Sequence, residues 1–380
     1  MNFEESDIQK EIRELSRKFA QKELQPIVDG DEKSETFRPE IIQKLGELGL
    51  TGVPTGENYG GTGLGYQELS IVIEELAAVN TTYAISVAVS GLPQIILSQF
   101  GTEEQKQKYI PPLASGTAIG AFSLSEASSG SDTASLRTTA EKKGDYYILN
   151  GTKLWCTQGD SAETLMVMAR TGKSGDRGIS TFLVKKDTPG FSLGKKEKKM
   201  ACNSSHTMEL VFDNAKIPKD QLIGKEGEGL KIALTALDSG RITIAATALG
   251  IARSALNQAV DHANEREQFG QKIIEFQGVS FLLADMLTEW NAANCLVQKA
   301  AWLNDQNKPH TVEAAMAKLF ATDMAMKVTT DAVQVLGGSG YTQEFAVERW
   351  MREAKVTQIV EGTNQIQRIV IGRSLYSKKA

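Results

Sequence analysis

The chain of 380 residues is longer than one hydrophobic core usually supports, so we expect two or three packed domains. Its net charge of -5 and the interspersed signs leave no basic face for a nucleic-acid backbone. The N-terminal stretch MNFEESDIQKEIREL lacks the basic and then apolar pattern of a targeting signal, and no apolar run approaches the roughly 20 residues that span a bilayer. We therefore expect a cytoplasmic protein without an integral membrane segment, rather than one of the mitochondrial matrix.

Cysteine and histidine are scarce and widely spaced. The complete set is Cys156, Cys202, Cys295, His206, His262 and His310. No CxxC or HExxH spacing occurs, so the sequence predicts reduced thiols and no metal site.

The first part of the chain, residues 1–117, has a helical pattern. Its segments include IQKEIRELSRKFAQKEL and ELSIVIEELAAV, and Thr102 and Gln105 have the spacing of a capping box before a further helix. We predict an N-terminal helical domain.

The middle part, residues 118–228, alternates short β-prone segments with turn signals. The pair Asn150-Gly151 separates YYIL from TKLW, which is the signal of a two-residue hairpin turn. We predict a middle β domain.

The last part, residues 229–380, returns to a helical period that first runs for some 36 residues. Two further long helical patterns follow with few breakers, which is typical of an antiparallel bundle. The predicted fold class is α+β, mainly α.

Residues 121–140, AFSLSEASSGSDTASLRTTA, are dense in serine, threonine and glycine. Such a segment is either a polar loop or a cradle of backbone and hydroxyl groups for a polar cofactor. Downstream, Trp155 and Thr157 are two apart on a predicted strand, so they share a face on which an indole could stack against a flat ring, although a core tryptophan is commoner.

Two later motifs have the same ambiguity. Arg266 offers a fork-shaped cation suited to a pyrophosphate, where Phe269-Gly270 breaks the helical pattern, but surface arginines are common. The glycines of QVLGGSGYTQE let a backbone approach a nucleotide or simply end a helix. No GxGxxG follows a strand, so a Rossmann site is not supported.

Glu361, in TQIVEGTNQ, allows three interpretations. It could be a solvated carboxylate, a partner for the dipole of a helix capped by Thr363 or Asn364, or a general base whose proton affinity is raised by an apolar wall. Its position alone does not choose between them.

Taken together, SLSEASSGSD, NGTKLWCTQG, LDSGRITIAATALGIA, REQFGQKIIEFQ, QVLGGSGY and VEGTNQIQR resemble the acyl-CoA dehydrogenase family in order and approximate spacing, over nearly the whole chain. The resemblance is greatest to the short-chain, butyryl-CoA type. It implies a homotetramer with FAD, an N-terminal helical domain, a middle β domain and a C-terminal antiparallel four-helix bundle. It also implies an acyl-CoA substrate, oxidised to the trans-2-enoyl-CoA, and an electron-transfer flavoprotein as acceptor.

The resemblance assigns roles to individual positions. The flavin-ring contacts that it implies are Phe122, Leu124, Ser125, Ser131, Trp155, Cys156 and Thr157. Contacts to the rest of FAD, across a subunit boundary, are implied for Arg266, Gln268, Phe269, Gln277, Gln334, Val335, Leu336, Gly337 and Gly338. Thr363, Asn364 and Gln365 would close the site. The substrate contacts are Ser131, Asp238, Ser239, Gly240, Arg241 and Gly362, and the base is Glu361.

Position 240 bears on the choice of base, because branched-chain and long-chain relatives can carry their carboxylate there. Gly240 supplies none, so the resemblance gives the role to Glu361. The departures from the family pattern at Ala127 and Gln158 leave the implied flavin contacts in place, whereas those at Asn203 and Val360 bear on the shape of the acyl pocket and on contacts with the electron partner. Two rival functions remain, an acyl-CoA oxidase and a non-catalytic flavin or CoA scaffold.

Overall fold

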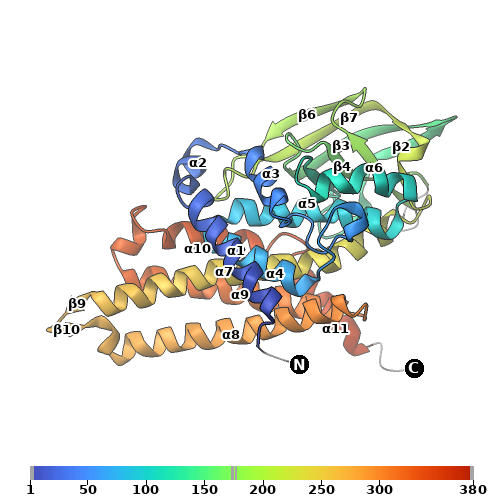
Figure 1. Ribbon diagram of the computed structural model, residues 1–380. Helices are drawn as coiled ribbons and strands as arrows, with labels where there is room; N and C mark the ends of the chain where they lie inside the picture. Colours follow the sequence, from blue (N-terminus) through green and yellow to red (C-terminus); the bar gives the residue numbers. More distant parts are fainter. Residues whose placement is uncertain (1–3, 173–174, 176–177, 377–380) are drawn as a thin grey trace.

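The computed structural model describes residues 4–172, 175 and 178–376. Figure 1 shows the strands of the middle part gathered at one end, the long C-terminal helices along the opposite side with the hairpin of residues 267–272, labelled β9 and β10, at their far tip, and most of the N-terminal helices between the sheet and the bundle. The N-terminal helices are α1 (Asp7–Phe19), α2 (Val28–Ser34), α3 (Pro39–Glu47), α4 (Tyr66–Ala77), α5 (Thr81–Phe100) and α6 (Glu103–Ala114).

Helix starts in this part are set by side-chain caps. The capping box expected at α6 is confirmed, because Thr102 accepts a hydrogen bond from Gln105 N and the Gln105 side chain accepts one from Thr102 N. Ser6 and Gln9 form the same arrangement at the start of α1. These bonds satisfy backbone donors that have no partner within the helix.

The middle part is one twisted sheet with strand order β6-β7-β3-β2-β4-β5-β8, and β1 pairs in parallel with β4. The strands are β1 (Gly120–Ser123), β2 (Thr139–Lys143), β3 (Tyr146–Thr157), β4 (Thr164–Arg170), β5 (Ile179–Lys185), β6 (Phe191–Lys196), β7 (Thr207–Pro218) and β8 (Leu222–Ile223).

The hairpin turn predicted at Asn150-Gly151 is wrong. Strand β3 runs straight through this pair, and Gly144 and Asp145 make the turn between β2 and β3 instead. At Gly151 the register against β7 shifts, and a Cβ there would lie 2.6 Å from Thr138 Oγ1. The glycine therefore permits a bulge and a close approach within the sheet, rather than a chain reversal.

The C-terminal part consists of α7 (Gly229–Glu265), α8 (Gln277–Asp305), α9 (Thr311–Leu336), α10 (Val347–Thr357) and α11 (Asn364–Tyr376). A small hairpin of β9 (Glu267–Gln268) and β10 (Gln271–Lys272) joins α7 to α8. The expected helix of some 36 residues is confirmed as α7, with 37 residues. Its small residues allow close packing: a Cβ at Gly250 would lie 2.3 Å from Glu74 O of α4.

Two described helices, α5 and α7, are long and apolar enough to cross a membrane, with a mean hydropathy of 1.3 each. The expectation that no apolar stretch reaches that length was therefore wrong. However, 67% of the apolar window in α5 and 83% of that in α7 are buried inside the structure. Both helices are thus core helices, because their apolar residues already pack against protein.

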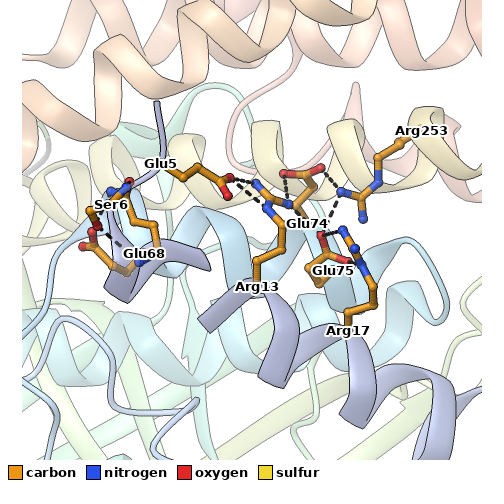
Figure 2. A network of polar contacts seen from close by, with 9 residues as sticks. Glu5, Ser6, Arg13, Arg17, Glu68, Glu74, Glu75 and Arg253 are labelled. Atoms are coloured by element: carbon orange, nitrogen blue, oxygen red, sulfur yellow. Dashed lines mark hydrogen bonds and ion pairs between the residues drawn. The ribbon is translucent and has the colours of Figure 1, made fainter. Parts of the chain in front are cut away.

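A buried ionic network joins the N-terminal helices to the C-terminal bundle (Figure 2). Arg13 and Arg17 of α1 donate to Glu75 of α4 at 2.6 and 3.0 Å, and Arg253 of α7 donates to the same carboxylate at 2.9 Å. Glu74 accepts from Arg13 and Arg253. Glu74 and Glu75 are only 3% and 2% exposed, so their charges depend on these three guanidinium groups.

Burial alone would raise the pKa of Glu75, but hydrogen bonds and charge from Arg17, Arg253 and Arg13 outweigh it and hold that pKa at about 2. The folded pKa lies below the ordinary value of 4.5. The resulting stabilisation is therefore fully present above the ordinary value, and it is lost as the pH falls through the folded pKa.

We predict that Glu75→Gln lowers the free energy of unfolding by about 3 kcal/mol at pH 7, because Arg17 loses its carboxylate partner and Arg13 and Arg253 each lose one of theirs. Urea denaturation midpoints, measured from neutral to acidic pH, should show the difference from the native protein shrinking below the ordinary carboxyl pKa. Glu14→Gln, which removes an exposed partner of Lys18, is the control and should change little. Equal midpoints for Glu75→Gln and the native protein at pH 7 would contradict the assigned role.

Candidate active site

Glu361 lies in the short connection between α10 and α11. Both Glu361 and Gly362 have left-handed backbone conformations, with φ of 55° and 87°. The residue as a whole is partly exposed, yet its Oε2 atom is buried and has no hydrogen-bond partner among the described residues. The interpretation as an ordinary solvated carboxylate is therefore wrong, and an unpaired buried carboxylate oxygen needs another explanation.

The environment makes this carboxylate a stronger proton acceptor than usual. Burial raises the pKa of Glu361 to about 7, although the positive charges of Arg241 and Lys318 oppose the shift. A base with a pKa in this range is well matched to proton transfer at neutral pH. The dipole interpretation is not needed to explain the helix that follows, because Thr363 Oγ1 accepts from Ile366 N at the start of α11.

Gly240 lies directly beside the carboxylate. A Cβ at position 240 of α7 would be 2.7 Å from Glu361 Oε2 and 3.3 Å from Leu92 Cδ2 of α5, so any side chain there would collide with Glu361. The neighbouring Asp238 and Arg241 form an ion pair of 2.5 Å. The predicted segment 238–241 and Glu361 are thus brought together, as the motif positions implied.

A cavity of about 120 Å³ extends from Gly240 between α4, α5, α7 and α8. Its walls include Leu92 and Ile95 of α5, Leu69 of α4 and the backbone at Gly91. Polar lining comes from Gln94, which is held by Thr55 and by the Thr51 carbonyl, and from Asn304, which donates to Ser239. This mainly apolar space begins beside the Glu361 carboxylate.

The backbone N–H of Glu361 is a second unused polar group. It forms no hydrogen bond within the part of the chain that the structure describes, and neither does the N–H of Gly362. A free donor next to a buried carboxylate can polarise a carbonyl oxygen while the carboxylate removes a proton from the adjacent carbon. The two functions would then come from one residue.

The predicted flavin-ring residues gather where the polar segment meets β3. Phe122 lies in β1, and in the loop that follows, Ser125 O accepts a hydrogen bond from Leu154 N, which fixes this loop beside β3. Trp155 is 53% exposed and Thr157 is partly exposed, whereas Cys156 between them is buried with its thiol against Phe122 O. The expected alternation along β3 is therefore observed. The Cys156 side chain points into the core.

These residues fit a flat ring with polar edges. The Trp155 indole lies at a bulge in β3 with φ of 59°, uncovered although it is a large apolar group. Ser131 is exposed beside Gly130, where a Cβ would meet nothing within 4 Å. An uncovered indole next to an open, hydroxyl-rich loop is suited to stacking and edge hydrogen bonding.

The remaining FAD positions lie at the opposite end of α7. The sheet contacts the first turn of this helix, where Gly227 N donates to Ser180, whereas Arg266 caps its last turn. At 1.5 Å per residue, the 37 residues of α7 separate these ends by about 55 Å. Arg266 therefore lies far from the end of α7 that contacts the sheet.

Arg266 and the glycine motif, by contrast, share one end of the bundle. Arg266 is exposed, and its guanidinium forms no hydrogen bond or ion pair with the described residues. Gln268, Phe269 and Gln277 are also exposed in or beside the β9–β10 hairpin. His262 of α7 packs edge-on against Phe345 at 6.4 Å, which brings the segment after α9 to the same end.

The glycine motif itself ends a helix. Gly337 has φ of 60° and its N–H donates to Val333 O, so the expectation of a helix C-cap is confirmed. Gln334, Val335 and Leu336 form the last turn of α9, and Gly338 follows. Near Glu361, Asn364 and Gln365 begin α11, where Asn364 is buried and Gln365 is exposed.

Three residues that sequence reasoning missed support these positions. Lys153 is fully buried and donates to Glu126 at 2.8 Å and to Leu124 O at 3.1 Å, which anchors the loop beside Trp155. Lys318 and Gln367, also fully buried, donate to Gly362 O at 2.9 and 2.8 Å. The only sequence signal for the lysines is a charged residue at a position where the periodicity places the core.

Comparison with known proteins agrees with this arrangement. Residues 6–117, 121–215 and 227–376 match the N-terminal, middle and C-terminal domains of acyl-CoA dehydrogenases, respectively. The chain is 44% identical over 378 residues to a short-chain-specific acyl-CoA dehydrogenase of Clostridium acetobutylicum, covering 99% of this chain and all of that protein.

Solved structures are equally similar. Butyryl-CoA dehydrogenase of Megasphaera elsdenii matches with a TM-score of 0.97 and 44% identity, over 99% of this chain and all of that one. A chain solved in work on the electron transferring flavoprotein of Acidaminococcus fermentans matches with a TM-score of 0.97 and 48% identity, over 99% of each chain. Solved relatives also include proteins with bound flavin. The chain therefore belongs to the acyl-CoA dehydrogenase family, whose members are FAD-dependent oxidoreductases acting on CH–CH groups.

Proposed function

We propose that the protein oxidises a short, straight-chain acyl-CoA to the trans-2-enoyl-CoA, with Glu361 as the base and an electron-transfer flavoprotein as the acceptor. The observation that carries the proposal is the buried, unpaired Oε2 of Glu361, which lies against Gly240, a residue that lines a mainly apolar cavity. A solvated carboxylate would expose this oxygen, and a structural one would have a donor at it.

Glu361 removes the α proton of the substrate. The deprotonated carboxylate is the active form, and its pKa of about 7 means that this form is populated at neutral pH while remaining basic. Because position 240 carries no side chain, the carboxylate packs directly against the backbone of α7, next to a residue that lines the cavity.

An α proton of a thioester is too weakly acidic for a carboxylate unless the carbonyl oxygen is polarised. The free N–H of Glu361 is available as a donor to that oxygen, and the left-handed conformation at residues 361 and 362 sets the direction of this N–H relative to the carboxylate. Removal of the proton and stabilisation of the developing negative charge are thereby coupled.

When bound, FAD would supply the two-electron acceptor for the hydride that leaves the β carbon. Trp155 and Thr157 would stack on and hydrogen-bond to the ring, and Ser131 lies on the same loop system. The pair Lys153 and Glu126, buried under this loop, keeps it in place.

The preference for a short chain rests on the cavity. An engineered cavity of about 150 Å³ accommodates benzene, so the measured 120 Å³ suits an acyl tail of similar or smaller size. Gly91 and Ile95 lie on one wall of the cavity and can be used to change its volume in opposite directions.

The assignment of the pyrophosphate to Arg266 supports a homotetramer. Arg266 has no partner in the described chain, and no hydrogen bond or ion pair of the described residues joins it to the Trp155 group. A flavin held by Trp155 of one subunit and Arg266 of another would lie at the boundary between them.

The electron acceptor is proposed from the likeness to the chain solved in the work on an electron transferring flavoprotein. An acyl-CoA oxidase would instead form peroxide directly. Rapid electron transfer to an electron-transfer flavoprotein, without stoichiometric peroxide, separates the two.

We predict that Glu361→Gln binds FAD and perturbs its spectrum on addition of butyryl-CoA, but that anaerobic bleaching slows at least about 10² to 10⁴-fold. The amide keeps the size of the side chain and removes its basic oxygen. Stopped-flow absorbance measures the rate, and Glu344→Gln, an exposed carboxylate, is the matched control. Bleaching of Glu361→Gln at the native rate would show that Glu361 is not the base.

The position of the base can be tested separately. Since a Cβ at 240 collides with a full-length side chain at 361, Gly240→Glu should be combined with Glu361→Gly rather than with Glu361→Gln. Partial recovery of bleaching relative to Glu361→Gly alone is expected if a carboxylate from α7 reaches the same carbon.

The chain-length proposal predicts a maximum of kcat/KM at four to six carbons in a panel of straight acyl-CoAs. Ile95→Ala should move this maximum to longer chains, and Gly91→Val should depress the longer substrates first. Each methylene is worth about 1 to 3 kcal/mol, so the shift is measurable. A kcat/KM that rises steadily from four to twelve carbons in the native protein would overturn the assignment.

We further predict that Arg266→Ala loses FAD on dilution and at high salt, because the only guanidinium assigned to the pyrophosphate is gone. Flavin content per chain after gel filtration measures this, and the same experiment reports the oligomeric state. Lys272→Ala removes another exposed cation from the same hairpin and should retain FAD. Stoichiometric flavin in Arg266→Ala after this treatment would refute the pyrophosphate role.

A further inference from the structure

Lys318 of α9 is a buried cation close to the reacting groups. Its side chain is fully buried, and no carboxylate in the described chain lies within ion-pair distance of it. Its ammonium donates to Gly362 O at 2.9 Å and to Asn364 Oδ1 at 2.8 Å. A buried ammonium without a paired carboxylate is unfavourable, so its retention at this position calls for a role.

The hydrogen bonds of Lys318 end on the loop that carries the base. Glu361 is in the left-handed region, which is strained for a residue with a side chain, by about 1 to 3 kcal/mol. Gln367 donates to Glu361 O at 3.2 Å and to Gly362 O at 2.8 Å, and Lys318 also donates to Gly362 O. The backbone carbonyls of Glu361 and Gly362 are therefore both hydrogen-bonded, which holds the strained conformation in place.

Asn364 extends this attachment into the bundle. It accepts from Lys318, and its amide donates to Thr322 Oγ1 at 2.9 Å and to Asp323 Oδ1 at 2.7 Å. Helix α9, the loop and the start of α11 are thus one hydrogen-bonded unit. A change at Lys318 acts on Glu361 through this unit rather than through the substrate.

The charges around Lys318 leave Glu361 as its main partner. On α7, Arg241 is paired with Asp238 at 2.5 Å. On α9 and α11, Asp323 is paired with Arg368 at 2.9 Å. Burial lowers the pKa of Lys318 to about 7, and the charge of Glu361 opposes this shift. Burial raises the pKa of Glu361, and the positive charge of Lys318 opposes that shift, so each charge favours the ionised form of the other group.

We propose that Lys318 is a positioning residue for the base: it holds the left-handed Glu361–Gly362 loop and supplies the positive charge that allows the buried carboxylate to ionise. Lys318 does not touch the substrate in this proposal. The inference rests on the proposed function of Glu361. It adds that Lys318 of α9 controls both the basicity and the orientation of the Glu361 carboxylate.

Two substitutions separate the contributions. Lys318→Gln keeps a donor for Gly362 O but removes the charge, whereas Lys318→Met removes both with little change in shape. The control is Lys327→Met, which removes an exposed lysine from the same helix, away from this loop.

The first measurement is the anaerobic bleaching rate with butyryl-CoA as a function of pH, at saturating substrate. In the native protein the rate should rise with pH as Glu361 loses its proton. Loss of a neighbouring positive charge disfavours the carboxylate, so the midpoint should move up by about one pH unit in both Lys318 variants. The plateau rate should fall about tenfold or more in Lys318→Met alone, because only this variant releases the loop.

The second measurement does not depend on turnover. The infrared carbonyl band of a protonated carboxyl, identified by its absence in Glu361→Gln, should persist to higher pH in both Lys318 variants than in the native protein and in Lys327→Met. If Lys318→Met does not fold, Lys318→Gln with this band and with its pH profile decides the question.

A native pH midpoint, a native carboxyl titration and a native plateau rate in a folded Lys318 variant would overturn the inference. This outcome is distinct from failure of the proposed function, in which Glu361→Gln itself would bleach at the native rate. If Glu361→Gln is inactive and the Lys318 variants behave as the native protein, only the role of Lys318 is wrong.

Discussion

The contact between Glu361 and the backbone of α7 at Gly240 is the constraint on which the rest of the site depends. With no Cβ at position 240, the carboxylate approaches within a distance that any side chain would exclude. This contact buries Oε2, and the burial is what raises its proton affinity. Gly240 also lines the cavity between α4, α5 and α7, so one residue contacts both the carboxylate and that cavity.

Contacts elsewhere in the fold hold α7 in the position at which Gly240 meets Glu361. Gly250 lets α4 approach the backbone of α7, and the network of Arg13, Arg253 and Glu75 joins α1, α4 and α7 at that level. Helix α5 then supplies Leu92 and Ile95 as walls of the cavity. The ionic network is far from the chemistry, but loosening it would change the distance between the cavity walls and the base.

The sequence was informative where chemistry requires particular residue types in order. The three-part organisation, the long helix from Gly229, the capping box at Thr102 and the candidate base all followed from patterns or motifs. The sequence was misleading where glycine has two structural uses. Asn150-Gly151 is a turn signal, yet Gly151 lies in a bulged strand, where the missing side chain makes room for Thr138. Lys318 could not be found this way, because a lysine in a helical pattern is normally solvated and only the packing of α7, α9 and α11 buries it.

The site concentrates unfavourable features that a stable bundle elsewhere must offset. An unpaired carboxylate oxygen, a left-handed glutamate and a buried ammonium lie within one loop and one helix turn. Each would relax if the loop were free: the carboxylate would turn to water, and the backbone would leave the left-handed region. Lys318, Gln367 and Asn364 prevent this by occupying the loop carbonyls and the start of α11. Because the strain is held by buried donors within the protein, the Glu361 carboxylate is already oriented without a ligand, and the binding of the proposed thioester substrate would not have to supply that order.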